Sequence, residues 1–148
     1  MTSLNELIDT LEQEIASVES LREVILLKQH AIITHDYDAL KEAMAVEESA
    51  IQHVRQYEQQ RLAFIAHCID DLDSKMQMLT LNDLIQQLDG ELTNVLTQQE
   101  QRLKTALQQV SYINDQNKML VNNSMNFIKE TINIVTENRT RQLVNKAI

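Results

Sequence analysis

A chain of 148 residues fits a single domain. With no proline and one glycine, it lacks the residues that build tight turns, which excludes a turn-rich β fold. It has no tryptophan and only 3% aromatic residues, which disfavours a deep ligand pocket. The formal net charge of −9 is uneven, because residues 1–100 carry six Lys or Arg against nineteen Asp or Glu and residues 101–148 carry seven against three. An acidic body without clustered basic residues excludes a nucleic-acid-binding role, and the basic excess of the last third could steer an acidic protein partner or lie against the acidic helices of the same chain.

The first predicted helix starts at a capping-box pattern formed by Ser3 and Glu6 and runs to about residue 33. Apolar side chains recur along it at every seventh position and in a second, parallel row. Glu14 and Lys28 interrupt the second row. The apolar residues of this stripe are Leu4, Leu7, Ile8, Leu11, Ile15, Val18, Leu21, Ile25 and Ile32.

Asp36 is the predicted N-cap of a second helix. Residues 34–36 form either a tight turn or a mild interruption in one long rod. The inner face of the second helix is interrupted by Glu47, Glu58 and Arg61, which predicts partial exposure or a kink. The acidic run at 70–74 starts a connection. The apolar residues of the inner face are Leu40, Met44, Ile51, Val54, Ile65, Cys68 and Leu72.

Thr80 and Asp83 form a second capping pattern, which predicts a short helix through Leu88. Asp89-Gly90 is a strong turn signal, and a helical pattern resumes from residue 91. The sequence therefore predicts an all-α fold, an elongated antiparallel helical bundle or coiled coil of three long helices plus a short helix. We expect a single bundle domain at residues 1–135 and a frayed or partner-ordered tail at 136–148, where periodic apolar residues are scarce.

The segment 120–135 has an apolar arc of about 180° at 100° per residue, with a polar row of Asn117, Ser124 and Thr131 along its middle. A helix in a two-helix hairpin buries only about 100°. The arc therefore indicates a helix that contacts its own bundle on one flank and another protein on the other. The alternative is a plain core face of a third helix packed between two others.

Asn114 and Asn117 allow two interpretations. They form either a polar notch that fixes the register of a coiled coil, or amides that hold the backbone of a bound peptide or a neighbouring helix.

No pattern of catalytic or metal-binding chemistry is present. The Glu-x-x-His motif of di-metal bundles, a Gly-rich phosphate loop and a nucleophile–base spacing are all missing, so we expect no enzyme activity, no cofactor and no metal. Cys68 is the only cysteine, the N-terminus lacks the features of a signal peptide, and no apolar run approaches the ~20 residues that span a bilayer. These features predict a cytoplasmic protein without membrane insertion.

Three motifs carry a resemblance to a known family. They are Asn114-x-x-Asn117-x-x-Leu120 followed by Ser124 and Phe127-Ile128, the helix restart Asp36-x-x-x-Leu40, and the Thr80-Leu81 start of the short helix. With these motifs the chain resembles the FlgN-like family, the flagellar export chaperones for hook-associated proteins. Lys118 departs from the small residue that members often carry there.

The resemblance implies a cytosolic chaperone of the flagellar type III export system. Such proteins bind the C-terminal segments of hook–filament junction proteins, prevent their premature assembly and help to deliver them to the export gate. The family's substrate-binding region maps here onto the helix from about Asn114 onward.

The predicted partner-binding surface follows from the wide arc and the resemblance together. We expect an amphipathic client helix to pack on it, with Met119 and Met125 adapting to different clients. The alternative function is a structural coiled-coil scaffold or self-assembling tether without a client, whose arc would be the seam of a homodimer. The partner-binding residues are Asn114, Asn117, Leu120, Val121, Ser124, Met125, Phe127, Ile128 and Ile132.

Overall fold

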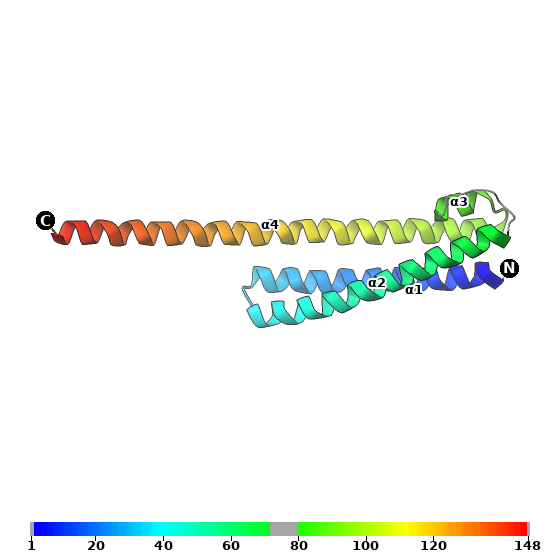
Figure 1. Cartoon of the computed structure of the whole chain (residues 1–148), viewed down its shortest axis with the longest axis horizontal. Coiled ribbons are helices and arrows are strands. Elements are labelled where there is room, and N and C mark those ends of the chain that lie inside the picture. The colour runs from blue at the N-terminus through cyan, green and yellow to red at the C-terminus, as the bar shows by residue number, and fades with distance from the viewer. Residues whose placement is uncertain (1, 72–79, 148) are drawn as a thin grey trace.

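The computed structural model describes residues 2–71 and 80–147, and the helices in these ranges are α1 (Thr2–Ile33), α2 (Tyr37–Asp71), α3 (Leu81–Gln86) and α4 (Glu91–Ala147). α1 and α2 form an antiparallel hairpin, and α4 runs parallel to α1 (Figure 1). The prediction of an all-α bundle with three long helices and a short one is confirmed. α1 begins one residue before the predicted cap at Ser3.

The connection at residues 34–36 is a tight turn. The amide of Asp36 donates to the carbonyl of Ala31 at 3.0 Å and the amide of His35 donates to Ile32 at 3.3 Å, which is the bonding pattern of a Schellman helix end. His35 has a positive φ of 54°. The Asp36 carboxylate then accepts from the Ala39 amide at 3.1 Å, so its predicted role as the N-cap of α2 is confirmed.

The short helix forms where Thr80 and Asp83 predict it. Thr80 caps α3 by accepting from the Asp83 amide at 3.2 Å, and α3 ends at Gln86 rather than at Leu88. Gly90 has a φ of 96°, a conformation that glycine adopts at no steric cost, and this ends the connection before α4.

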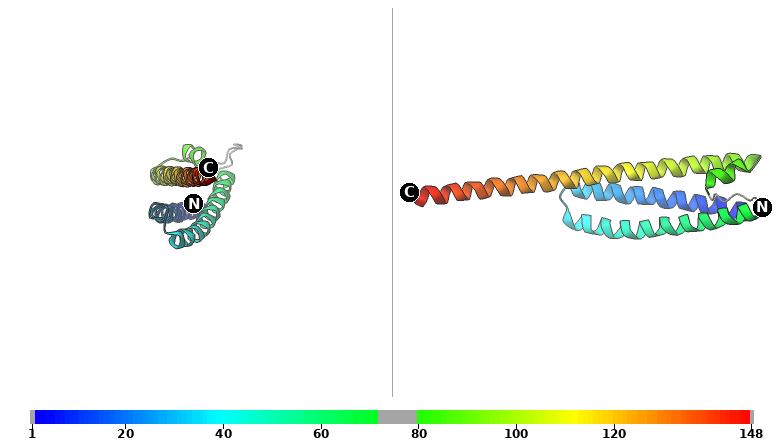
Figure 2. Two further views of the ribbon diagram at one scale, coloured as in Figure 1. Left: turned by 90° about the vertical axis from the view of Figure 1, so that its left-hand side faces the viewer. Right: turned by 45° about the horizontal axis from the view of Figure 1, so that its top comes forward.

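α1 is the central helix of the bundle. It packs against both α2 and α4, whereas no backbone contact joins α2 to α4 within the described residues. Figure 2, seen end-on, shows α1 between α4 and the first half of α2. The predicted stripe of α1 supplies more of the buried hydrophobic side chains than any other described helix, and its fully buried residues are Leu7, Leu11, Ile15, Val18 and Ile25.

Two ion pairs join the positions that interrupt the apolar rows of α1 and α2. Arg61 Nε lies 2.8 Å from Glu14 Oε2, and Lys28 Nζ lies 3.0 Å from Glu47 Oε2. Glu14 and Lys28 are two heptads apart on α1, and Glu47 and Arg61 are two heptads apart on α2. One antiparallel alignment of the two helices therefore brings both pairs together. Opposite charges at facing positions therefore fix how the hairpin aligns.

The apolar face of α2 is only partly covered, as predicted. Ile65 and Cys68 are buried, whereas Met44 is exposed, which corrects its assignment to the inner face. α2 continues as one helix through Asp71. Leu72 and most of the predicted connection at 70–74 lie outside the described residues.

α4 is much longer than the helix on which it packs. Its 57 residues span about 86 Å, against about 48 Å for the 32 residues of α1. The outer part of α4 therefore projects beyond the hairpin (Figure 1). The division at residue 135 stays a prediction, since α4 passes through it as one helix to Ala147 and residues 136–143 are exposed.

Replacing Arg61 with Leu is expected to destabilise the hairpin. The Glu14 side chain is only 3% exposed, and the substitution leaves its carboxylate buried without a counter-charge. We expect the free energy of unfolding to fall by about 3 kcal/mol in urea titrations followed by circular dichroism. The double variant Glu14→Leu/Arg61→Leu is the control and should return to within about 1 kcal/mol of the native chain. A single variant as stable as the native chain would contradict this account of the register.

The stability of the fold should also depend on the proton at Glu14. Burial raises the pKa of this carboxyl above its usual value, and Arg61 opposes part of the rise. A carboxyl whose pKa is higher in the folded chain costs stability above that pKa, and the cost disappears as the pH falls toward the unfolded value. As the pH falls from neutral to mildly acidic, the free energy of unfolding of the native chain should therefore rise relative to that of the Glu14→Gln variant. A pH-independent difference would show that the carboxyl is not desolvated.

Candidate partner-binding surface

The packing face of α4 is a heptad seam with alternating spacings of three and four residues. The positions up to Asn117 are buried or half-buried against α1, those at Leu120 and Ser124 are half-buried, and those from Phe127 onward are exposed. The seam becomes polar after Ile134, at Asn138 and Arg141. Its members are Leu96, Gln99, Leu103, Ala106, Val110, Ile113, Asn117, Leu120, Ser124, Phe127, Thr131 and Ile134.

The seam loses its cover because α1 ends. Asn117 lies beside Ile25, and Ile33 is about two turns farther along α1, so the cover ends near residue 125 of α4. Beyond it the apolar side chains are open to water, with Phe127 70% and Ile132 58% exposed. We call this surface the overhang face. It consists of Met125, Phe127, Ile128, Ile132, Ile134 and Val135, with Val121 at its inner border. All are exposed, so the alternative of a core face enclosed by this chain's own helices does not hold.

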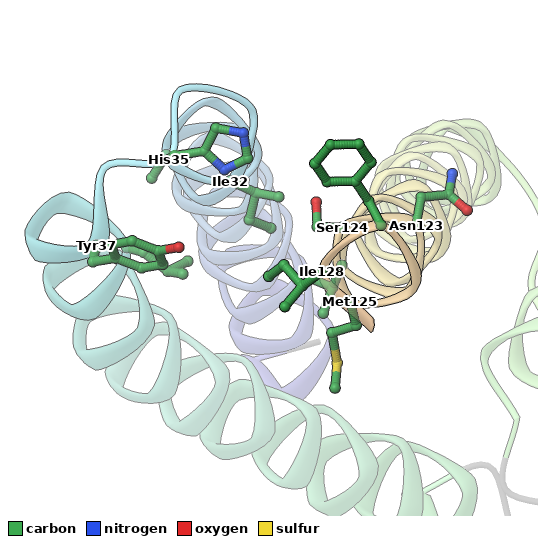
Figure 3. Close-up of a pocket in the computed structure, with 11 residues that line it drawn as sticks. Ile32, His35, Tyr37, Asn123, Ser124, Met125 and Ile128 are labelled. Atoms are coloured by element: carbon green, nitrogen blue, oxygen red, sulfur yellow. The ribbon is translucent and has the colours of Figure 1, made fainter. Parts of the chain in front are cut away.

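At its inner end the overhang face becomes one wall of a groove. The groove has a volume of about 610 Å³, and its opposite wall is the tip of the α1–α2 hairpin. In Figure 3, Ile128 of α4 points toward Ile32 and Tyr37 of the hairpin. Five predicted site residues line the groove: Val121, Ser124, Met125, Phe127 and Ile128.

Sequence reasoning missed the hairpin wall of this groove. It is formed by Ile32, His35, Tyr37 and Leu40, together with Ala31. The signal that could have indicated it is Tyr37, one of three tyrosines, which directly follows the Asp36 cap and is 72% exposed. Tyr37 lines one groove with Met125, Phe127 and Ile128, and a contiguous exposed apolar surface of this kind marks an interaction site.

Asn117 lies inside the bundle. It is 3% exposed, and its Nδ2 donates to the backbone carbonyl of Ile25 at 3.2 Å, while its Oδ1 is buried without a hydrogen-bond partner. Its amide therefore holds a neighbouring helix of the same chain and forms a polar notch in the α1–α4 seam. Asn114 and Leu120 are half-buried, and Ile132 is exposed on α4 beyond the groove.

A second hollow of about 390 Å³ continues the groove toward Asn117. It shares Ile32 and Val121 with the groove, and its other lining residues are polar: Lys28, Asn114, Asn117, Lys118 and Asn122. Lys28 is paired with Glu47 of α2, so this hollow lies on the α2 side of the seam. The groove thus has an apolar mouth and a polar inner end.

Met119 does not belong to the overhang face. It is 64% exposed, but nine residues separate it from Ile128, which places the two on opposite sides of the helix at 100° per residue. Of the two methionines predicted to adapt to clients, only Met125 lines the groove.

The described residues offer few other chemical features. Among them, no three His, Cys, Asp or Glu side chains gather into a group that could hold a metal ion. None of the helices found within residues 2–71 and 80–147 has an apolar stretch sufficient to cross a membrane. The apolar groove and the overhang face are therefore the surface on which a function can be argued.

The family described as FlgN protein matches residues 1–145, which is nearly the whole chain. No curated protein and no solved structure matches it.

Replacing Asn117 with Leu is expected to stabilise the bundle by about 1 kcal/mol. The substitution removes a buried acceptor that has no partner, and the Ile25 carbonyl keeps its own α-helical bond. Urea titration of the two proteins measures the difference, with the exposed change Asn126→Leu as the control. If the free energy of unfolding instead fell by more than about 2 kcal/mol, the hydrogen bond from Asn117 to Ile25 would stabilise the bundle by more than the unpaired Asn117 oxygen destabilises it.

Proposed function

The chain belongs to the FlgN family of flagellar export chaperones, and we propose that it binds the C-terminal helical segments of hook–filament junction proteins in the cytoplasm. Chaperones of this family bind flagellar hook-associated proteins. In our proposal, binding keeps these proteins from assembling prematurely and aids their delivery to the flagellar type III export gate. The chain does this as a binding protein without catalytic activity.

The observation that carries the proposal is the uncovered overhang face. A large apolar surface, interrupted here only by Ser124 and Thr131, is unfavourable in water and marks an interaction site. A client segment that forms an amphipathic helix would bury its apolar stripe against this face and enter the groove beside the hairpin tip. Phe127 and Ile128 are the central contacts of this proposed docking, since both line the groove and both are more than half exposed.

Release of the client requires no motor within this chain. A segment that is disordered when free pays an entropic cost when it folds on the chaperone, and this cost reduces the net affinity. Met125, Phe127 and Ile128 of the groove are each more than half exposed, so in this proposal a bound helix leaves the groove without unfolding of the bundle. Handover at the export gate could therefore be driven by competition alone.

Introducing a charge at Ile128 should abolish client binding. Ile128→Glu places a carboxylate in the apolar groove, which should weaken the Kd for a hook-associated C-terminal segment by about thirtyfold or more. Isothermal titration calorimetry measures the Kd, and circular dichroism checks that helicity is kept. The matched control is Asn126→Glu, which adds the same charge to an exposed position about 160° away around α4.

Equal binding by the native chain and Ile128→Glu would exclude this face as the docking site. Stable self-association of the native chain in light scattering, without any client binding, would favour the scaffold alternative, in which the face is a homodimer seam.

A further inference from the structure

The flank of α4 that adjoins the groove carries a row of basic residues. At 100° per residue, Lys118, Lys129 and Arg139 lie within about 100° of Ile128, on the side of Met125 and Ile132. They are spaced by about three helical turns each. All are exposed, and within the described residues none has an ion-pair partner in the structure.

The flank of α4 that carries this basic row has no acidic residue of its own from Lys118 onward. Asp115, Glu130 and Glu137 are the acidic residues between residues 101 and 148, and helical spacing puts all of them within about 40° of the line opposite Ile128. Asp115 lies one turn before Lys118, but no ion pair joins a member of the basic row to an acidic residue of α4 within the described residues. The first member of the row, Lys118, also lines the polar inner end of the groove, on the side of the seam that faces α2.

From this arrangement we propose that the groove selects a client helix whose apolar stripe is bordered on one side by acidic residues. This inference rests on the proposed function and adds the chemistry of the partner. An acidic residue near Lys118 and a second one about eleven positions away, near Lys129, would pair with the row while the apolar stripe covers Val121, Met125 and Ile128. Pairs at the rim of an apolar contact chiefly determine orientation and partner choice.

Charge also distinguishes a client from a second copy of this chain. If two copies paired antiparallel through their overhang faces, the two basic rows would lie on the same side of the seam and meet like charge, which is unfavourable. A separate acidic helix meets no such repulsion. The occupant that fits is therefore a partner helix of negative charge.

Removing the two lysines should weaken binding selectively. The variant Lys118→Gln/Lys129→Gln lowers the net charge by two, and the control Gln52→Glu/Gln59→Glu lowers it by the same amount at exposed positions of α2 that line neither hollow. At about 50 mM salt, the Kd for a hook-associated C-terminal segment should weaken about three- to tenfold in the lysine variant and by less than twofold in the control. Near 500 mM salt the native chain and the lysine variant should converge, because salt screens exposed pairs. Lys118→Arg/Lys129→Arg should keep the native affinity.

The outcomes separate the two proposals. If Ile128→Glu loses the client while both charge variants weaken binding equally, the acidic-helix inference is overturned and the docking site stands. If the native chain binds no segment at any salt, both proposals fail. A dimer of the native chain that the lysine variant dissociates in light scattering would assign the basic row to self-association and overturn the inference.

Discussion

The mismatch in length between α4 and α1 determines what this protein can offer to a partner. Helices that pack side by side bury the same number of turns, so the residues of the longer helix beyond the end of the shorter one lose their cover. α4 keeps its heptad seam through Ile134, although α1 ends near residue 125 of α4. The sequence therefore continues to encode a packing face where the chain provides nothing to pack on it. Natural helices that end in solvent normally turn polar at that point, and α4 does so only after Val135.

The groove depends on this overhang being held at a fixed position beside the hairpin tip. Lys28–Glu47 and Glu14–Arg61 fix the alignment of α1 with α2, and Asn117 fixes that of α1 with α4. Each device is polar and costs desolvation, and hydrophobic replacements at such positions are often more stable. An apolar seam alone would tolerate slippage by a heptad, so we infer that these polar contacts contribute to the specificity of the register. A slip would carry Ile32 and Tyr37 away from Ile128 and remove one wall of the groove.

Much of the fold could be read from periodicity and capping, and the limits of that reading have a physical cause. Asp36 and Thr80 determine helix starts through local hydrogen bonds, so a single sequence predicts them well. How far one helix extends along another is set by pairings between distant residues, which periodicity within one helix does not contain. In the sequence, Lys28 and Glu47 are therefore separate interruptions of two apolar rows, whereas in the structure they form an ion pair. For the same reason the exposed arc of α4 was predictable, whereas its neighbour, the hairpin tip with Tyr37, was not.

The overhang face is exposed to water, and under the docking proposal it also accepts a partner, so polar groups whose hydrogen bonding changed between the two states would cost free energy there. Thr131 lies in the middle of the overhang seam, and its hydroxyl already donates to the Phe127 carbonyl within the same helix at 2.8 Å. A hydroxyl satisfied in this way requires neither water nor a client for its donor, so covering it costs little. It also leaves a smaller apolar area than a leucine would, which lowers both the tendency to self-associate and the affinity for any partner. The same seam position is filled by Leu103 and Val110 where α4 packs permanently on α1 and by Ser124 and Thr131 toward its open end. Along this position of the seam the apolar side chains that pack on α1 are replaced by hydroxyl side chains where α1 ends, with the buried Asn117 between them. Such a change fits a reversible contact, which is what the proposed client docking requires.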